Sequence, residues 1–325
     1  MTTAKFSKDI LTLACESATD ELAEFIKSQV FDKFKRKGAV VGLSGGIDSS
    51  VTAALSVKAL GRERVMGVIL PERESSPKSE RYSVLLAQQL GIQYERVDLT
   101  PVLESLACYE KKEKVIKASF PEYNSTYKYK LILPQNLLDK DRINFYTLII
   151  EDPQGNRKSK RLSPKEFFEI MAANDMKQRC RMLMLYYFAE KNNYIVAGTT
   201  NRSEMVQGFF VKYGDGGVDI EPIAHLYKAQ VIALAAYLGL PDEIIKRTPS
   251  PDTYSLEVSD EEFYFCLPYD RLDLLLYAWE HNIPMHEVTS ELNLTEQQVA
   301  RAFKDFDIKR QATWHLTQLP VAPVQ

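Results

Sequence analysis

The densest group of chemically capable side chains lies in residues 43–50, which read Leu-Ser-Gly-Gly-Ile-Asp-Ser-Ser. Two adjacent glycines let the backbone take positive φ angles and approach a ligand closely. The serines add hydroxyl donors, and Asp48, which would repel a bare phosphate, indicates a divalent cation beside it. The group predicts a site for a nucleotide with Mg²⁺. Its candidate residues are Leu43, Ser44, Gly45, Gly46, Asp48, Ser49 and Ser50.

The surroundings of this segment predict a strand, a tight loop and a helix. An apolar run precedes the loop at 40–43, and residues 51–55 continue in an apolar pattern typical of a helix. A helix that starts here points its free N–H groups and positive dipole end at an anion in the loop. Walker A and dinucleotide-binding motifs need a Gly-Lys-Ser/Thr or a G-x-G-x-x-G pattern, and the segment has neither.

The segment Ser-Gly-Gly-Ile-Asp-Ser-Ser instead resembles the pyrophosphate loop (S-G-G-x-D-S) of the ATP pyrophosphatases. The resemblance implies that the loop holds the β- and γ-phosphates of ATP, which leave as pyrophosphate after a substrate is adenylated. An ordinary Gly/Ser turn between a strand and a helix is the alternative interpretation.

The composition is that of a globular enzyme, with 325 residues, 45% hydrophobic and 26% charged. The 41 basic and 44 acidic side chains leave a net charge of −3, which gives no electrostatic footprint for general nucleic-acid binding. The four cysteines are far apart and the four histidines have no ligand spacing, so we expect buried thiols and no zinc site. Without a signal core or a membrane-spanning run, the protein is expected to be cytoplasmic.

Alternating helical and apolar segments predict the fold class. We expect an amphipathic helix over 8–37, strands at 65–70 and 92–99, and a helix over 81–90. This order predicts an α/β fold with a doubly wound, mostly parallel sheet covered by helices on both faces. Ligands bind beyond the carboxyl ends of such strands, where 43–50 and the next loop, 71–76, would lie. Arg73 in that second loop could therefore reach the nucleotide.

Residues 109–164 interrupt this alternation. They contain a basic helix-like piece at 111–117, an aromatic stretch at 120–129, and a β-hairpin over 145–162 with its turn at 151–156. We interpret the segment as a surface insertion that folds over the active site or packs on a partner subunit. Binding of single-stranded nucleic acid is the alternative.

A second group of polar residues follows a helix predicted over 174–192 and a strand over 194–198. Thr199 comes at the carboxyl end of that strand, and Glu204 supplies a second carboxylate that could share a metal with Asp48. The glycine-rich segment 213–219 follows with Lys212 beside it, and Lys228 lies at the start of another helix.

The order of these motifs resembles that of the ammonia-dependent NAD synthetases, whose fold is that of the adenine nucleotide alpha hydrolases. The family patterns N-x-K-x-R-x-R-M, A-G-T-x-N-x-x-E, K-x-G-D-G-x-x-D and P-I-x-H-L-Y-K correspond in order to 174–189, 197–204, 212–219 and 222–228. The resemblance implies that the 43–50 segment, Thr199 and Lys228 bind ATP and that Asp48 and Glu204 bind Mg²⁺, while Arg73 is assigned to ATP by its place in the sheet. For deamido-NAD it implies Asn174, Arg181, Lys212, Asp219 and Lys309.

The implied reaction adenylates the carboxylate of deamido-NAD, after which ammonia displaces AMP to give NAD. Asp48, Lys228 and Thr199 would be the catalytic residues, acting by position and charge without a protein nucleophile. The family also implies a homodimer. About forty residues precede the loop, so no glutaminase domain is expected there, and ammonia would arrive free or from a separate glutaminase.

Several alternatives remain open. The insertion and the unusual segment 250–256 could reshape the acceptor pocket for another small carboxylate, for example a sugar acid. A transfer-RNA thiolating enzyme would need paired cysteines, and a dead nucleotide site would have lost Asp48 or Glu204.

The C-terminal part is expected to be helical, with a catalytic domain at 1–266 and an extension at 267–325. Helices are predicted over 269–281 and 285–292, and Thr295 begins a capping box that opens a third helix through 310. This helix–turn–helix order could bind DNA, but the balanced charges of the last helix favour packing.

Overall fold

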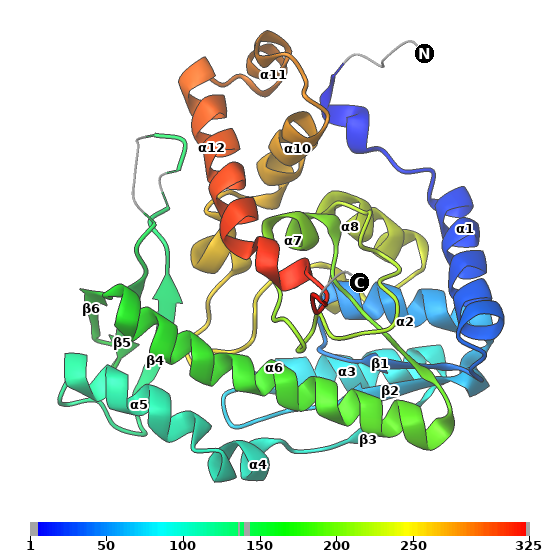
Figure 1. The fold of residues 1–325 in the computed structure, drawn as a ribbon, viewed down its shortest axis with the longest axis horizontal. Helices are drawn as coiled ribbons and strands as arrows, with labels where there is room; N and C mark the ends of the chain where they lie inside the picture. Colours follow the sequence, from blue (N-terminus) through cyan, green and yellow to red (C-terminus); the bar gives the residue numbers. More distant parts are fainter. Residues whose placement is uncertain (1–5, 136, 140–143, 323–325) are drawn as a thin grey trace.

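The computed structural model describes residues 6–135, 137–139 and 144–322. Its central sheet has four parallel strands in the order β3-β2-β1-β7 (Figure 1). The strands are β1 (Ala39–Gly42), β2 (Val65–Ile69), β3 (Gln93–Arg96) and β7 (Ile195–Ala197). Ala39 of β1 is paired with Val65 of β2 and with Ile195 of β7. The predicted doubly wound parallel sheet is therefore confirmed.

Helices cover both faces of this sheet because β1, β2 and β7 are apolar on both sides, whereas the edge strand β3 is exposed. Ala39 and Val41 of β1 face a core built with α1 (Cys15–Ser28), α2 (Ile47–Leu60), α3 (Pro77–Leu90), α8 (Lys228–Tyr237) and α9 (Asp242–Ile245). Val40, between them, faces the opposite core, which includes residues of α4 (Thr100–Ser105), α5 (Cys108–Ser119) and α6 (Pro164–Asn192). The alternation follows from the two-residue period of a strand.

The N-terminal segment differs from the single helix predicted over 8–37. It forms a 3₁₀ turn, η1 (Lys8–Leu11), then α1, and ends in a π-helical turn, η2 (Gln29–Lys33). Thr12 takes an extended conformation between η1 and α1, and Leu11 packs against the C-terminal helices instead of the main sheet. The apolar residues of this segment therefore pack into two different cores, and their spacing in the sequence does not show which residue belongs to which core.

The insertion contains α5 and an antiparallel sheet in the order β4-β5-β6. The predicted hairpin is confirmed as β5 (Thr147–Glu151) and β6 (Arg157–Arg161), whose turn is closed by Asp152 accepting the N–H groups of Gln154 and Asn156. The third strand, β4 (Lys128–Ile132), was expected only as an aromatic stretch. Buried Tyr129 and aliphatic side chains from these strands pack against residues of α5 and α6.

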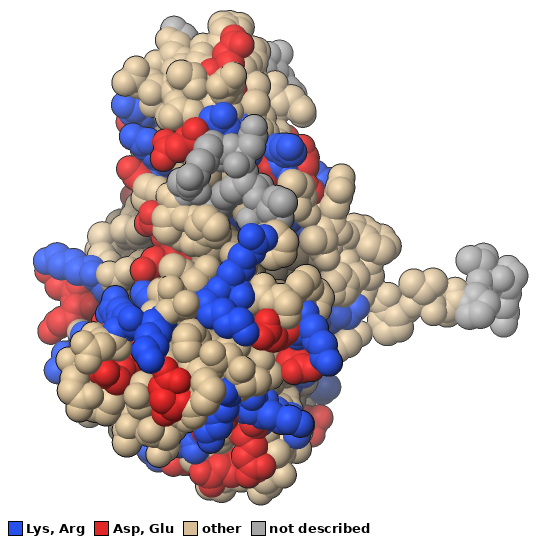
Figure 2. All heavy atoms as spheres, turned by 90° about the vertical axis from the view of Figure 1, so that its left-hand side faces the viewer, with Lys and Arg blue, Asp and Glu red and all other residues tan. Residues whose placement is uncertain are grey.

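Basic side chains of the insertion are interspersed with acidic ones on its outer face (Figure 2). Lys158 pairs with Glu122 at 2.6 Å, and Lys160 pairs with Glu166 at 3.0 Å. Among the described residues, such pairs offset part of the positive charge of this face.

Helix α6 begins ten residues earlier than the predicted start at 174. Ser163 caps it, Pro164 occupies its first turn, and Glu166 completes a capping box with Ser163. Figure 1 shows the helix running from the insertion to the main sheet. It contacts α5 at one end and β1 and β7 at the other, so it joins the two parts of the molecule.

The C-terminal part is helical, as predicted, and stands apart from the main sheet in Figure 1. Its helices are α10 (Tyr269–Glu280), α11 (Met285–Leu292) and α12 (Glu296–Thr313). Thr295 and Gln298 form the predicted capping box. The division of the chain at residue 266 stays a prediction.

Short elements complete the chain: η3 (Arg62–Arg64), α7 (Arg202–Gln207), η4 (Glu261–Phe265) and η5 (Trp314–Thr317). Among the described residues, no helix is long and apolar enough to cross a membrane.

Candidate active site

A cavity of about 470 Å³ opens at the carboxyl ends of β1, β2 and β7. Its walls come from the phosphate loop (residues 43–50), from α6, from residues 208–215 and from a loop at 248–254. This is the place where an open parallel sheet is expected to bind its ligand. Most of the residues singled out in the sequence line it: Leu43, Ser44, Gly46, Asp48, Ser49, Asn174, Arg181, Thr199, Glu204, Lys212 and Lys228.

The phosphate loop is held open by its own hydroxyl groups. Ser44 Oγ lies 3.0 Å from Ser49 Oγ and accepts the Gly46 N–H, while Ser50 donates to the Gly46 carbonyl. Gly45 has φ +69°, and a Cβ there would lie 2.4 Å from the Ser79 carbonyl oxygen, so a side chain does not fit. The loop leads directly into the N-terminus of α2, which favours an anion. Ser50 is buried behind the loop instead of lining the cavity.

Arg247 adds a positive charge to this loop and was not identified in the sequence. Its guanidinium donates to the Gly45 carbonyl at 3.0 Å and to Ser79 Oγ at 2.7 Å. No motif surrounds Arg247, and about two hundred positions separate it from the loop, so only the fold reveals the contact.

The two predicted metal ligands meet beside the phosphate loop around one buried lysine. Lys228 Nζ lies 2.6 Å from Asp48 Oδ2 and 3.9 Å from Glu204 Oε1. Asn201, the N-cap of α7, donates to Asp48 Oδ1 at 3.0 Å and forms a capping box with Glu204. The fold thus brings Asp48, Glu204 and Lys228 together from three separate helices.

Burial and the closeness of charged neighbours shift the pKa values of Glu204 and Lys228. Burial, with Asp48 nearby, raises the pKa of Glu204 well above its usual range. Burial alone would lower the pKa of Lys228, but the carboxylates of Asp48 and Glu204 outweigh it and raise that pKa. Asp260, to which no role was assigned from the sequence, also lines the cavity, and burial raises its pKa to about 6. A cation would relieve this crowding of carboxylates.

The donor set suits a hard cation that also binds the nucleotide. Asp48 and Glu204 offer carboxylate oxygens, the ligands that Mg²⁺ prefers. Within the described ranges no cluster of three or more His, Cys, Asp or Glu side chains could hold a metal by itself. The remaining ligands would therefore be phosphate oxygens and water, as is usual for Mg²⁺.

The far part of the cavity is aromatic. Tyr146 stacks on Phe167 with ring centroids 4.3 Å apart, and Phe209 stacks on Tyr264 at 4.8 Å. All four side chains line the cavity. Because Tyr146 belongs to the insertion, this segment contributes a wall of the site, as one of the two interpretations of the insertion predicts. Flat aromatic walls suit a planar ring of a substrate.

Two predicted acceptor residues border the cavity and are held by main-chain carbonyls. Arg181 donates to the Leu70 carbonyl at 3.3 Å. Lys212 Nζ donates to the carbonyls of His315 and Gln318, at 2.9 and 2.7 Å. Asn174 accepts the Tyr129 hydroxyl at 3.3 Å. The C-terminal segment therefore fixes Lys212 at the rim.

Besides Gly45 and Ser50 of the phosphate loop, three predicted site residues do not line the cavity. Arg73 stacks over the Tyr109 ring at 3.8 Å and pairs with Glu113. Asp219 supports β7 by accepting the Val196 N–H and the Tyr186 hydroxyl. Lys309 is buried and pairs with Asp305 at 2.8 Å. Their contacts in this structure are with the protein, so any contact with ligand would need rearrangement.

Comparison with known proteins places these features in a family. The family model described as NAD synthase matches residues 18–128 and 110–313. An NH(3)-dependent NAD(+) synthetase of Mesorhizobium japonicum is 43% identical over 97% of this chain and 99% of its own length. One from Thermotoga maritima is 38% identical over 81% of this chain and 87% of its own.

Solved structures support the fold. An NMN synthetase from Francisella tularensis superposes with a TM-score of 0.66 at 22% identity, covering 96% of this chain and 99% of that one. An NH3-dependent NAD synthetase from Campylobacter jejuni gives a TM-score of 0.62, also at 22% identity, over 96% of this chain and all of that one.

Proposed function

The chain belongs to the NAD synthase family, and we propose how its own residues carry out the family reaction. It is an ammonia-dependent ligase that uses ATP to convert deamido-NAD into NAD, with release of AMP and pyrophosphate. The observation that carries the assignment of roles is the meeting of Asp48, Glu204 and Lys228 at the phosphate loop.

The first step is adenylation of the deamido-NAD carboxylate, which attacks the α-phosphorus of ATP and displaces pyrophosphate. We assign the phosphate loop and the N-terminus of α2 to the β- and γ-phosphates, with Arg247 holding the loop in shape. Lys228 supplies a fixed positive charge where the pyrophosphate departs. Thr199, at the end of β7, lines the same part of the cavity and is assigned to the nucleotide.

Asp48 and Glu204 are assigned as ligands of Mg²⁺ because their oxygens meet beside the loop. When bound, Mg²⁺ neutralises phosphate charge and stabilises the leaving pyrophosphate. The chain's own contribution is to aim the two carboxylates, through Asn201 and the capping box of α7.

In the second step ammonia attacks the activated carbonyl carbon, and AMP leaves with the bonding electron pair. No side chain needs to become covalently attached, because position and charge supply the rate enhancement. We assign Lys212, Arg181, Asn174 and the aromatic wall to the dinucleotide acceptor, since all line the cavity and the three polar side chains bond to residues outside the phosphate loop. A separate glutaminase as the source of ammonia stays a prediction.

A homodimer is proposed as the functional form. Helix α6 exposes large apolar side chains, with Leu183 63% and Tyr187 53% exposed, one helical turn apart. The N-terminal helix α1 adds Phe25, 41% exposed. Apolar surface of this kind supports burial against a second subunit.

Adenylation can be tested apart from amidation. Without ammonium, labelled pyrophosphate should exchange into ATP only when deamido-NAD is present, because the reverse of the first step needs the adenylated acceptor. Exchange that ignores deamido-NAD would contradict the assigned order of steps.

A further inference from the structure

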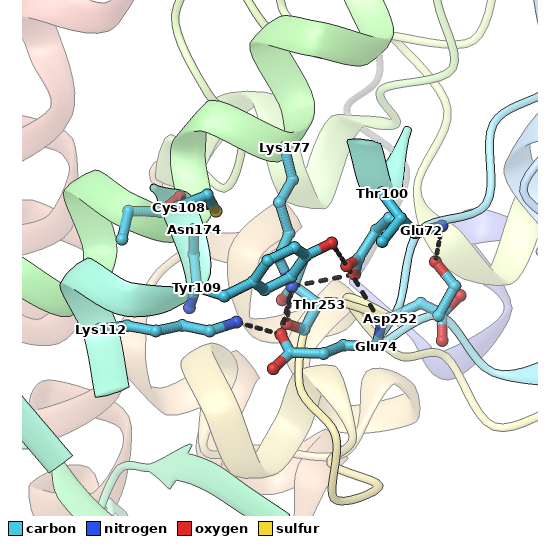
Figure 3. Close-up of polar contacts among 12 residues, drawn as sticks. Glu72, Glu74, Thr100, Cys108, Tyr109, Lys112, Asn174, Lys177, Asp252 and Thr253 are labelled. Atoms are coloured by element: carbon cyan, nitrogen blue, oxygen red, sulfur yellow. Dashed lines mark hydrogen bonds and ion pairs between the residues drawn. The ribbon is translucent and has the colours of Figure 1, made fainter. Parts of the chain in front are cut away.

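A buried cluster of charged side chains lies behind the cavity wall and is not used by the assigned mechanism. It contains Glu72 and Glu74 from the loop after β2, Lys177 from α6, and Tyr109 and Lys112 from α5 (Figure 3). Lys112 and Lys177 are at most 1% exposed. Two carboxylates and two ammonium groups leave the cluster formally neutral, as deep burial requires.

Lys177 is the centre of the cluster. Its Nζ donates to Glu72 Oε1 at 2.9 Å, to Glu74 Oε2 at 2.5 Å and to the main-chain carbonyl of Thr253 at 2.8 Å. The three acceptors use all three ammonium protons. Burial alone would lower the pKa of Lys177, but the two carboxylates outweigh it and raise the pKa, so the side chain stays charged.

The two glutamates are in turn fixed by the insertion. Glu72 Oε2 accepts the Tyr109 hydroxyl at 2.7 Å, and Lys112 pairs with Glu74. Lys112 differs from Lys177 in that burial, together with the charge of Lys177, lowers its pKa to about 8. The cluster therefore has a centre, Lys177 with Glu72, and a peripheral pair, Lys112 with Glu74.

Thr253 belongs to a loop, residues 248–256, that lines the cavity over 248–254. The neighbouring Asp252 accepts the Ser76 N–H and the Ser79 hydroxyl at 2.6 Å. Ser79 also contacts Arg247, which holds the phosphate loop. The 248–256 loop thus lies between the phosphate loop and the insertion, and Lys177 is bonded to its main chain.

We propose that Lys177, oriented by Glu72, is a positioning residue that holds the 248–256 loop in the shape that receives the carboxylate acceptor. The inference rests on the proposed function for the identity of that acceptor. A main-chain carbonyl is the bonded group, so the lysine acts on the loop whatever side chains the loop carries. The ATP end of the cavity has its own supports in Arg247 and Ser44.

Two charge-neutral double variants separate positioning from mere stabilisation. Lys177→Met/Glu72→Gln removes the bond to the Thr253 carbonyl and leaves the Lys112–Glu74 pair. Lys112→Met/Glu74→Gln removes that pair and the carboxylate charge that faces Lys177 at 2.5 Å, and it leaves Lys177 bonded to Glu72 and Thr253. Each removes one buried cation and one buried anion, so the two are matched in charge.

For the first variant the KM for deamido-NAD should rise about tenfold, with the KM for ATP changing less than about twofold, because one charge-assisted bond to the acceptor-side loop is lost. Hydrogen exchange of the free protein should quicken about tenfold in residues 248–256 and stay unchanged in β1. The second variant should stay within about twofold of the parent in both measurements.

Equal effects of the two double variants, or faster exchange in β1 to the same extent as in 248–256, would overturn the proposal. If the first variant does not fold, Lys177→Arg is the substitute. It keeps the positive charge, but its planar guanidinium does not match the positions of the three oxygen atoms that accept from the ammonium group. An unchanged KM for deamido-NAD in that variant would equally overturn it. Should the parent make no NAD from deamido-NAD, the proposed function fails, while the exchange comparison still decides whether Lys177 holds the loop.

Discussion

Lys228 Nζ lies 2.6 Å from Asp48 Oδ2, and the two residues are 180 positions apart in the chain. Asp48 belongs to the first turn of α2, and Lys228 is the first residue of α8. Parallel strands place the loops that follow them at one edge of the sheet, which explains why these helix starts meet. The contact puts a fixed cation and a candidate metal ligand at the site where pyrophosphate leaves.

Asp48→Asn should reduce AMP formation by about 100-fold or more, because the amide keeps the shape but removes the charge that faces Mg²⁺ and Lys228. AMP release would be followed by chromatography and the fold by circular dichroism. Asp20→Asn, at the surface pair with Lys58, is the control and should match the parent. AMP formation at the parent rate in Asp48→Asn would refute the assigned metal role.

Lys212→Ala should raise the KM for deamido-NAD about ten- to a hundredfold and leave that for ATP nearly unchanged, since a charge-assisted bond at the acceptor side is lost. Arg247→Ala should do the reverse, because Arg247 supports the phosphate loop. Steady-state kinetics with each substrate varied in turn measures both. If either variant changed the KM for ATP and the KM for deamido-NAD to the same extent, the assignment of Lys212 to the acceptor and Arg247 to the ATP site would be wrong.

Glu221 should make stability depend on pH. Burial raises its pKa to about 8, although Thr200 donates to the carboxyl through its N–H and hydroxyl. Because the folded-state pKa of Glu221 is raised, the protonated carboxyl stabilises the fold. This contribution is fully present below pH 4.5, the usual pKa of a glutamate, and it is lost as pH rises through about 8.

Relative to Glu221→Gln, whose neutral amide mimics the protonated acid, the parent should lose up to about 5 kcal/mol of unfolding free energy between those two pH values. Urea titrations at several pH values test this, with the exposed Glu24→Gln as a control that should leave the profile unchanged. A constant difference between parent and Glu221→Gln across the range would show that Glu221 ionises normally.

The proposed homodimer should sediment with twice the chain mass at micromolar concentration. Leu183→Glu on α6 should shift it toward the monomer, because a charge would replace an exposed apolar side chain at the interface. Lys165→Glu, on the same helix but 87% exposed and charged already, provides the comparison. A monomeric parent would contradict the proposal.

Local patterns predicted much of the fold. The phosphate loop, the parallel sheet, the hairpin at 151–156 and the Thr295 capping box depend on residues close in sequence, and all are present. The early start of α6 was also readable, because Ser163, Pro164 and Glu166 form a capping signal. Strand β4 was not predicted, because residues 120–129 were interpreted only as an aromatic stretch and the strand depends on its pairing with β5.

The parts that were missed depend on contacts between distant residues. Arg247 and Asp260 have no motif around them: Arg247 meets the phosphate loop through Gly45 and Ser79, and Asp260 lines the same cavity. Arg73 had the right position in sequence to meet the nucleotide, but Tyr109 and Glu113 of the insertion hold it elsewhere. Sequence periodicity carries no information about which of several nearby partners a long side chain chooses.

The most direct test of the central claim is to incubate the purified protein with ATP, Mg²⁺, ammonium and deamido-NAD and to quantify AMP, pyrophosphate and NAD by chromatography. We predict the three products in equal amounts and none of them when deamido-NAD is omitted, while Asp48→Asn should lower all three by about 100-fold or more. Absence of AMP and NAD with deamido-NAD, together with AMP formation from another small carboxylic acid such as a sugar acid, would contradict it.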